Sequence, residues 1–283
     1  MLWALLSTFF DALASISRKK SLELNSILSA YGFKILWMFG PIVLVPIFFM
    51  THSYSFQHLT GSLTLLVIAI CFVRIVSTNL SQYIYKNEKI TTLMPYENLN
   101  KVMSIIVSFY ILQDGNIKTV IIAFVVIILL LFSSVDIKNI RLPRVFSLVF
   151  IHESLVALRA LLTAFVLKKL LNYVDYYMLE SCILAIFLII GAFTYRDFQR
   201  FPLLDKKFYA YRLTAWFLGS LSNVISLYLI TSIGLISSII LSFLWIVAKL
   251  CMSWFILKET IKKKDILLAL SVTGLVAIWF FVK

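Results

Sequence analysis

Long apolar runs separated by short polar clusters make up most of this chain. A helix that spans a membrane needs about 20 mostly apolar residues, and cutting the chain at its polar clusters leaves ten runs of about that length. They are residues 2–17, 26–50, 61–84, 90–112, 116–135, 144–167, 176–194, 209–230, 233–257 and 265–282. Strands of a membrane barrel would alternate apolar and polar positions, whereas the run from Thr119 to Phe132 is continuously apolar after its first residue. The pattern predicts an all-helical (all-α) polytopic membrane protein with ten transmembrane helices.

Composition also favours a membrane environment. Of the 283 residues, 61% are hydrophobic and 14% are charged, against about half and about a quarter in soluble domains. These proportions exclude an ordinary soluble enzyme, a disordered chain and a disulfide-rich scaffold. Cys71, Cys182 and Cys251 all fall inside predicted spans, and we interpret them as small buried hydrophobic residues. The first apolar run lacks a basic start and a small-residue cleavage site, so we expect a first helix rather than a signal peptide.

The two halves of the chain resemble each other. A shift of about 145 residues aligns them without a gap, and it places Tyr83 on Tyr228 and Lys118 on Lys263. In both halves a long apolar run ends in a polar-acidic turn that carries a lysine, and a last apolar run follows. We therefore expect two five-helix repeats, residues 1–140 and 141–283. An odd number of spans in each repeat inverts the second relative to the first, as in many secondary transporters.

The end of the chain resembles a known family. Residues 231–234 (Thr-Ser-Ile-Gly) and 256–260 (Ile-Leu-Lys-Glu-Thr), followed by the last span, look like the end of the EamA-like transporters of the drug/metabolite transporter superfamily. The opening Leu-Trp-Ala-Leu-Leu at 2–6 and the pair Lys19 and Lys20 are similar to that family as well. The resemblance implies a secondary transporter whose two termini are cytoplasmic.

The distribution of basic residues predicts the opposite orientation. The chain has 26 Lys and Arg against 13 Asp and Glu, a net charge of +13. Sixteen of the basic residues fall in one alternate set of loops and four in the other. Because basic loops stay in the cytoplasm, this count predicts that both termini face away from it.

Several ionisable residues interrupt the apolar runs. The ten that fall inside predicted spans are Asp11, Lys34, Arg74, Glu97, Lys101, Glu153, Arg159, Glu180, Arg212 and Lys249. At the bilayer centre each would cost about 2.5–3.5 kcal/mol, so we expect most of them to face a wet cavity or one another. Polar residues recur at helical spacing on the third, fourth, sixth, eighth and ninth spans, as a central solute pathway requires.

Lys101 and Lys249 are the main candidates for contacting a solute. The repeat maps Lys249 to Ser104, on the same helical face as Lys101, so each half contributes one lysine. Lysines on the fourth and ninth helices of the similar nucleotide-sugar and sugar-phosphate carriers meet the substrate's phosphate, which is what the resemblance implies here. The predicted substrate-binding residues are Arg74, Asn79, Tyr96, Glu97, Asn100, Lys101, Arg159, Arg212, Asn223, Trp245 and Lys249. The candidate proton-coupling residues are Asp11, Glu97 and Glu153.

Each of these residues also has a structural interpretation. Glu97 and Lys101, four apart on a helix, can neutralise each other. Serines on membrane helices often serve close packing. His152 is equally well explained as a buried histidine, and Glu153 beside it is expected to point to a different face of the helix.

The leading functional hypothesis is a secondary transporter that moves a small polar, anionic metabolite by alternating access. The alternatives are an exporter of amino acids or amines, and a membrane-embedded lipid-modifying enzyme or flippase subunit. The sequence has no Asp-x-x-Asp pair, no Gly-rich phosphate loop and no metal-ligand spacing among His52, His58 and His152. We therefore expect no catalysis, cofactor, metal or nucleic-acid partner. The expected partners are a solute and membrane lipid, for a monomer or homodimer in the inner cell membrane.

Overall fold

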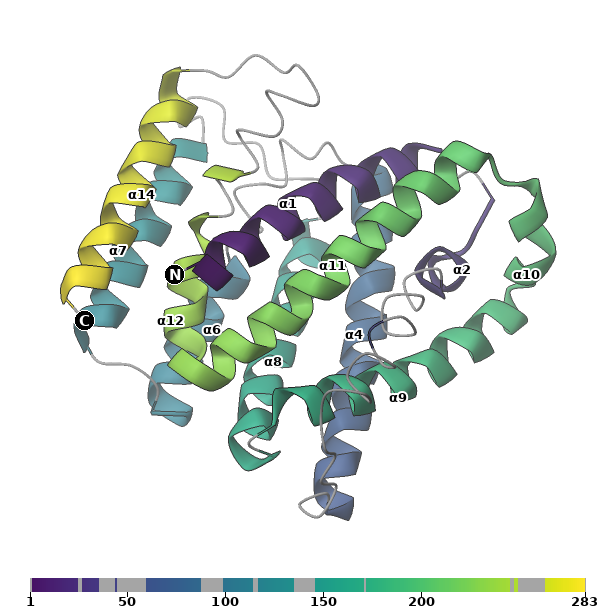
Figure 1. Cartoon of the computed structure of the whole chain (residues 1–283), viewed down its shortest axis with the longest axis horizontal. Coiled ribbons are helices and arrows are strands. Elements are labelled where there is room, and N and C mark those ends of the chain that lie inside the picture. Colours follow the sequence, from purple (N-terminus) through teal and green to yellow (C-terminus); the bar gives the residue numbers. More distant parts are fainter. Residues whose placement is uncertain are drawn as a thin grey trace. The chain divides into compact units, whose positions relative to one another are not determined.

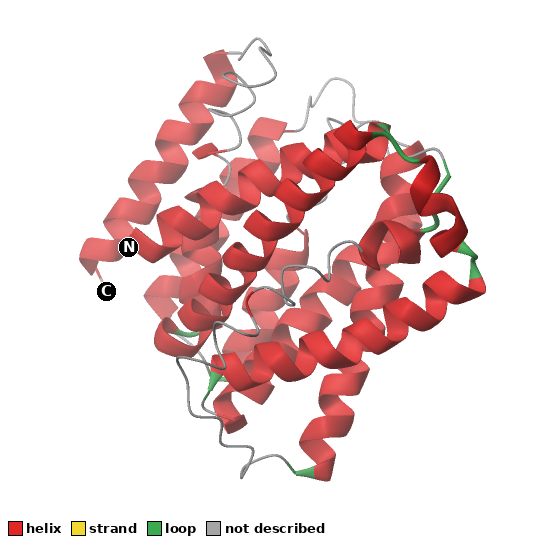
Figure 2. Cartoon of the chain, turned by 45° about the vertical axis from the view of Figure 1, so that its right-hand side comes forward, coloured by secondary structure: helices red, strands yellow, loops and turns green. Residues whose placement is uncertain are grey.

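The structure is a computed structural model that describes residues 2–24, 27–35, 44, 60–87, 99–113, 117–134, 146–170, 172–244, 247–248 and 263–282. Helices account for most of these residues, and no strand occurs among them (Figures 1 and 2). The prediction of an all-helical fold is therefore confirmed for the described part of the chain.

The described elements follow one another along the chain. They are α1 (Leu2–Glu23), α2 (Ala30–Ile35), α4 (Gly61–Asn87), α6 (Leu99–Ile111), α7 (Ile117–Ser134), α8 (Phe146–Leu170), α9 (Tyr173–Thr194), α10 (Asp197–Arg200), the 3-10 helix η5 (Phe201–Leu203), α11 (Lys206–Ile233), α12 (Leu235–Ser242) and α14 (Lys263–Val282). Each of the ten predicted spans overlaps one of the longer helices or, for 26–50 and 233–257, the short helices α2 and α12.

Within the described residues, four helices are long and apolar enough to cross a membrane. They are Gly61–Ile84, Phe146–Lys169, Tyr173–Thr194 and Lys206–Ile233, and two shorter apolar helices cover Asn100–Ile111 and Ala269–Trp279. These helices indicate a membrane protein. The full set of ten spans stays a prediction.

Local sequence explains two of the helix boundaries. The Asn172 side chain accepts a hydrogen bond from the Val174 amide at 2.9 Å, and Asp175 lies in the first turn, so α9 begins with both a cap and a favourable charge. Gly234 separates α11 from α12 with a φ of 83°, a conformation that residues with a Cβ rarely adopt.

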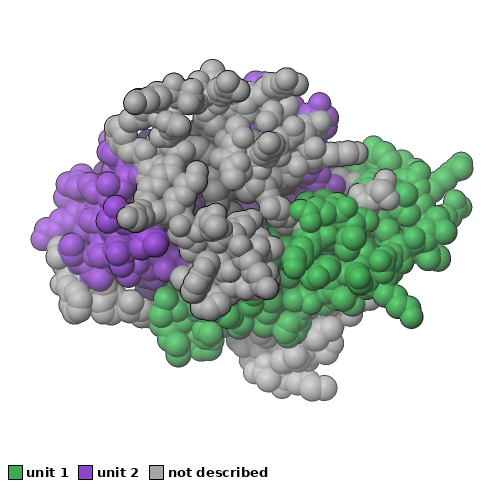
Figure 3. Space-filling model, turned by 90° about the horizontal axis from the view of Figure 1, so that it is seen from above, with its two compact units in different colours: residues 1–72, 166–228 green, residues 73–165, 229–283 purple. Residues whose placement is uncertain are grey.

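The chain forms two compact units, drawn in green and purple in Figure 3. Unit 1 comprises residues 1–72 and 166–228, and unit 2 comprises residues 73–165 and 229–283. Each unit therefore combines sequence from both predicted repeats. The repeat boundary at residue 140 falls outside the described residues, and the division into two repeats stays a prediction.

In unit 1, α1 and α11 pack along each other in opposite directions (Figure 1). The Trp3 ring lies 6.5 Å from that of Tyr228, and further along α1 the Ser7 hydroxyl lies 3.1 Å from those of Ser222 and Ser226. Residues early in α1 thus meet residues late in α11. Small polar side chains let the two backbones approach closely, which is how helices associate in a bilayer.

The second contact in unit 1 joins α2 to α9 and α10. The buried rings of Phe33 and Phe208 pack with Leu22, Leu28 and Phe201. This apolar cluster lies where α1 ends and α11 begins. This cluster places the start of α11 against α2.

In unit 2, α7 packs against α6, α12 and α14, and α12 also packs against α6. Separately, Ile84 near the end of α4 and Val149 near the start of α8 form a small buried cluster with Leu80 and Leu148. These contacts bring together helices that carry several of the predicted site residues.

Candidate functional site

Lys101 lies in the first turn of α6, in unit 2. Its Nζ is 4.6 Å from the centre of the Phe243 ring, which follows α12. A cation over an aromatic face is stabilised by the ring's quadrupole, so this contact holds the ammonium group between α6 and the end of α12. Lys101 has further interactions besides this one.

A hydrogen bond joins Asn100, the residue before Lys101, to Glu153, and His152 lies near the same carboxylate. The Asn100 amide Nδ2 donates to Oε2 of Glu153 on α8 at 2.5 Å, and Nε2 of His152 is 3.8 Å from Oε1 of the same carboxylate. Glu153 is 3% exposed. The expectation that His152 and Glu153 point to different faces is wrong, because the imidazole and the longer carboxylate side chain bend toward each other from neighbouring backbone positions.

The arrangement in unit 2 is suited to binding and to proton transfer. Asn100 and Lys101 are consecutive residues of α6. The amide that donates to the buried Glu153 carboxylate and the Lys101 ammonium group are therefore carried by the same helix. A buried carboxylate beside an imidazole can hold or release a proton. These side chains lie within or next to helices that are apolar enough to enter a membrane.

The other predicted residues of unit 2 lie on α4 and α8. Arg74 is buried, whereas Asn79 and Arg159 are partly buried. The Ser77 and Thr78 hydroxyls donate to the backbone carbonyl of Arg74 at 3.2 and 2.7 Å. Both hydroxyls therefore form hydrogen bonds to the backbone of their own helix, α4.

Arg212 and Asn223 lie on α11 in unit 1, not in unit 2. The Arg212 Nε donates to the backbone carbonyl of Phe33 at 2.9 Å, and its guanidinium carbon lies 3.8 Å from the centre of the Phe33 ring. Asn223 is partly buried, and its Nδ2 has no hydrogen-bond partner in the structure. Arg212 was predicted to share a site with Lys101, whereas its contacts lie within unit 1.

Several predicted residues lie outside the described part of the chain. They are Tyr96, Glu97, Trp245 and Lys249. Asp11, the third proton-coupling candidate, lies on α1 in unit 1 and is partly buried. The hydroxyl of Ser226, which the sequence places on a polar stripe, contacts Ser7 and so takes part in helix packing.

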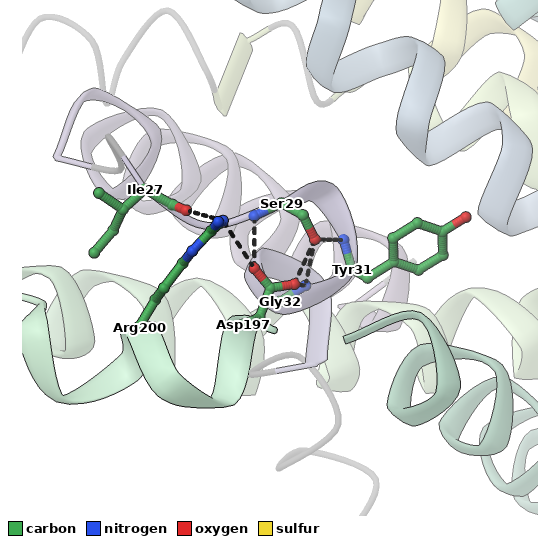
Figure 4. Close-up of polar contacts among 6 residues, drawn as sticks. All are labelled: Ile27, Ser29, Tyr31, Gly32, Asp197 and Arg200. Atoms are coloured by element: carbon green, nitrogen blue, oxygen red, sulfur yellow. Dashed lines mark hydrogen bonds and ion pairs between the residues drawn. The ribbon is translucent and has the colours of Figure 1, made fainter. Parts of the chain in front are cut away.

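One buried carboxylate in unit 1 was not among the predicted site residues. Asp197 is fully buried and accepts hydrogen bonds from the Ser29 amide at 2.9 Å and the Gly32 amide at 3.0 Å, and from the Ser29 hydroxyl (Figure 4). Arg200 donates to the Ile27 carbonyl at 2.9 Å and lies 4.0 Å from Asp197. The Ser29 hydroxyl in turn accepts from Tyr31 and Gly32, so this group caps the start of α2.

Two further observations limit the chemistry of the described residues. They contain no group of three His, Cys, Asp or Glu side chains that would hold a metal ion. Cys71 is buried as predicted, whereas Cys182 is exposed, and neither forms a disulfide.

No family model and no curated protein sequence matches the chain.

Proposed function

We propose that the protein is a secondary transporter of the drug/metabolite type that moves a small anionic metabolite across the inner cell membrane. The observation that carries the proposal is the buried carboxylate of Glu153, which accepts a hydrogen bond from Asn100, the residue before Lys101 on α6, and has His152 near it. Ionisable residues within membrane helices are costly, so they mark solute or proton pathways by default.

Charge balance supports an anionic solute. Within the predicted spans of unit 2, the basic residues Arg74, Lys101, Arg159 and Lys249 outnumber the acids Glu97 and Glu153. This excess of positive charge attracts a phosphate or carboxylate. In the proposed site Lys101 contacts the anion together with Lys249, and Asn79 and Asn100 offer hydrogen-bond donors.

Helix pairing supports two repeats that alternate around such a site. The offset of about 145 residues relates α2 to part of α9, and α7 to α14, and the helices of each pair are in contact. Helices related by a twofold axis meet where the axis passes between them. Inverted repeats of this kind place the substrate site near the bilayer midplane.

A second set of contacts repeats with the same offset. In unit 1, Trp3 contacts Tyr228. Shifting these two positions gives Leu148 and Tyr83, and in unit 2 Leu148 lies in the cluster that includes Ile84, next to Tyr83. The start of α1 therefore packs on the end of α11 as the start of α8 packs on the end of α4.

Glu153 is the proposed coupling carboxylate. Its neighbour His152, with Nε2 3.8 Å from the carboxylate, offers a second group that can carry a proton. A proton on Glu153 would weaken the charge-assisted hydrogen bond from Asn100, and because Asn100 precedes Lys101 on α6, this change is transmitted to the proposed solute site.

An exporter of amino acids or amines is the second candidate. The specific observation in its favour is that an acid, Glu153, accepts a hydrogen bond from Asn100, the residue before Lys101. A zwitterion would use a cation and an acid together. This candidate predicts that Glu153→Gln weakens solute binding as much as Lys101→Ala does, whereas an anion carrier retains binding in Glu153→Gln.

The test is a thermal-shift screen of the purified protein against nucleotides, sugar phosphates, amino acids and amines, followed by uptake into proteoliposomes. We expect an anion to stabilise the protein, and we expect stabilisation and uptake to be lost in Lys101→Ala. Lys118→Ala is the matched control, because Lys118 is exposed at the start of α7 in the same unit. Normal uptake in Lys101→Ala would overturn the site.

A further inference from the structure

The Arg212 guanidinium is buried with one donor unused. Arg212 is 3% exposed, its Nε is bonded to the Phe33 carbonyl and its plane lies against the Phe33 ring. Its Nη1 is inaccessible to solvent and has no hydrogen-bond partner in the structure. A buried donor of a charged group costs free energy until it is bonded.

Arg212 also lacks a counter-ion. No carboxylate of a described residue forms an ion pair with it, and the charged group that acts on it is another cation, Arg18. A buried charge without an opposite partner costs several kcal/mol, and a like charge nearby adds to the cost. An anion bound to Nη1 of Arg212 would offset both costs.

The packing of α1 on α11 places further basic residues at the same end of unit 1. Near the end of α1, Lys20 lies 5.2 Å from the centre of the Tyr211 ring, which precedes Arg212 in the chain. Arg18 is exposed on α1, and Lys206 and Lys207 are exposed at the start of α11. The buried Arg212 and the exposed Arg18 thus offer two guanidinium groups from two helices.

Helix length sets the depth of these two arginines. Arg212 follows the first residue of α11 by six positions and Arg18 precedes the last residue of α1 by five, which is about 9 and about 8 Å along the helix axis. With the helix ends in the headgroup region, both arginines lie near the boundary between headgroups and acyl chains. Phosphate groups are the anions that occur at this level.

We propose that Arg212 and Arg18 form a phosphate-binding site in unit 1. A guanidinium fork matches the oxygens of a phosphate, and Nη1 of Arg212 supplies the unused donor. The phosphate belongs either to the headgroup of an anionic phospholipid or to a free phosphate ion. The site rests on contacts within unit 1 and does not depend on the proposed transport function.

The experiment measures thermal unfolding of the full chain with two probes. The first is inorganic phosphate against chloride at equal ionic strength, in detergent. The second is phosphatidylglycerol against phosphatidylcholine in nanodiscs. The variants are Arg212→Gln, Arg212→Lys and Arg18→Gln, and the control is Lys207→Gln, which removes one exposed positive charge at the same end.

We expect at least one probe to raise the unfolding temperature of the native chain and of Lys207→Gln. The response should need about tenfold more probe in Arg18→Gln, because a charge-assisted hydrogen bond is lost, and it should weaken in Arg212→Lys. A response to phosphate alone identifies a free ion, and a response to phosphatidylglycerol alone identifies a lipid.

Arg18→Gln keeps the test decisive if Arg212→Gln does not fold, because Arg18 is exposed. The proposal is overturned if neither probe stabilises the native chain, or if Arg18→Gln responds as the native chain does. Loss of uptake in Lys101→Ala with an unchanged phosphate response would leave this site standing, so the two proposals can fail separately.

Discussion

The Asn100 amide on α6 donates a hydrogen bond to the Glu153 carboxylate on α8, with 2.5 Å between Nδ2 and Oε2. The two residues are far apart in the chain, and the bond joins two helices of unit 2. It also ties the residue before Lys101 to the buried acid of the same unit.

Asn100→Ala should lower the free energy of unfolding by about 1–3 kcal/mol, because a buried carboxylate loses a donor. The measurement is thermal or denaturant unfolding of the purified protein in detergent. Ser154→Ala is the control, since the Ser154 hydroxyl donates to the Phe150 carbonyl of its own helix and should matter less. Equal stability of the two variants would contradict the bond.

Asp197→Ala should lower the free energy of unfolding by about 3 kcal/mol or more, because buried amides of Ser29 and Gly32 lose their acceptor. Asp205 offers a matched comparison: its exposed carboxylate accepts a hydrogen bond from the Lys207 amide at 3.0 Å before α11. Asp205→Ala should cost about 1 kcal/mol, the usual effect of removing a helix cap. A smaller loss for Asp197 than for Asp205 would refute the ranking.

Gly191→Ala should destabilise unit 1 by about 1–3 kcal/mol, the usual cost of overpacking. A Cβ at Gly191 would lie 2.2 Å from the Tyr31 ring, where α2 packs on α9. Gly274→Ala on α14 is the control, because nothing lies within 4 Å of its Cβ position. That variant should be neutral or more stable, since alanine favours a helix. Similar unfolding temperatures in both variants would show that α2 does not approach α9 so closely.

The basic end of unit 1 should face the cytoplasm. Gln199 is exposed at that end and Lys168 is exposed before the other end of α9, about 33 Å away along a helix of 22 residues. With the native cysteines replaced by alanine, Gln199→Cys should react with a membrane-impermeant thiol reagent only from the cytoplasmic side. Lys168→Cys should react only from the opposite side. The reverse pattern would support the orientation that the family resemblance implies.

The helices could be predicted because apolar runs of sufficient length have few alternatives in a chain of this composition. The predicted run 61–84 becomes the helix Gly61–Asn87, and 265–282 becomes Lys263–Val282. Errors fall at the ends, where caps and polar turns decide the boundary.

The site was harder to predict, because helical phase describes backbone directions and not side-chain bends. Helical phase places His152 and Glu153 on different faces of the helix, yet Nε2 of His152 lies 3.8 Å from Oε1 of Glu153. Charge counting identified Arg212 but gave no sign that it contacts Phe33, a residue of another helix.

Asp197 could not be predicted from local pattern. Its bonds reach Ser29, 168 residues earlier, and it follows Arg196, whose φ of 55° is unusual for a residue with a side chain. A serine before a helical run is the one signal in the sequence, since it marks Ser29 as a possible helix cap.

The bond between Asp197 and Ser29 also bears on how the protein is made. During synthesis the start of α2 leaves the ribosome long before residue 197, and all of residues 73–165, which belong to unit 2, come between them. Unit 1 therefore cannot be completed while the chain is still growing through unit 2. Until residue 197 is made, the start of α2 lacks the hydrogen bonds that Asp197 accepts. Nascent chains that end before residue 197 should therefore be open to proteolysis around α2.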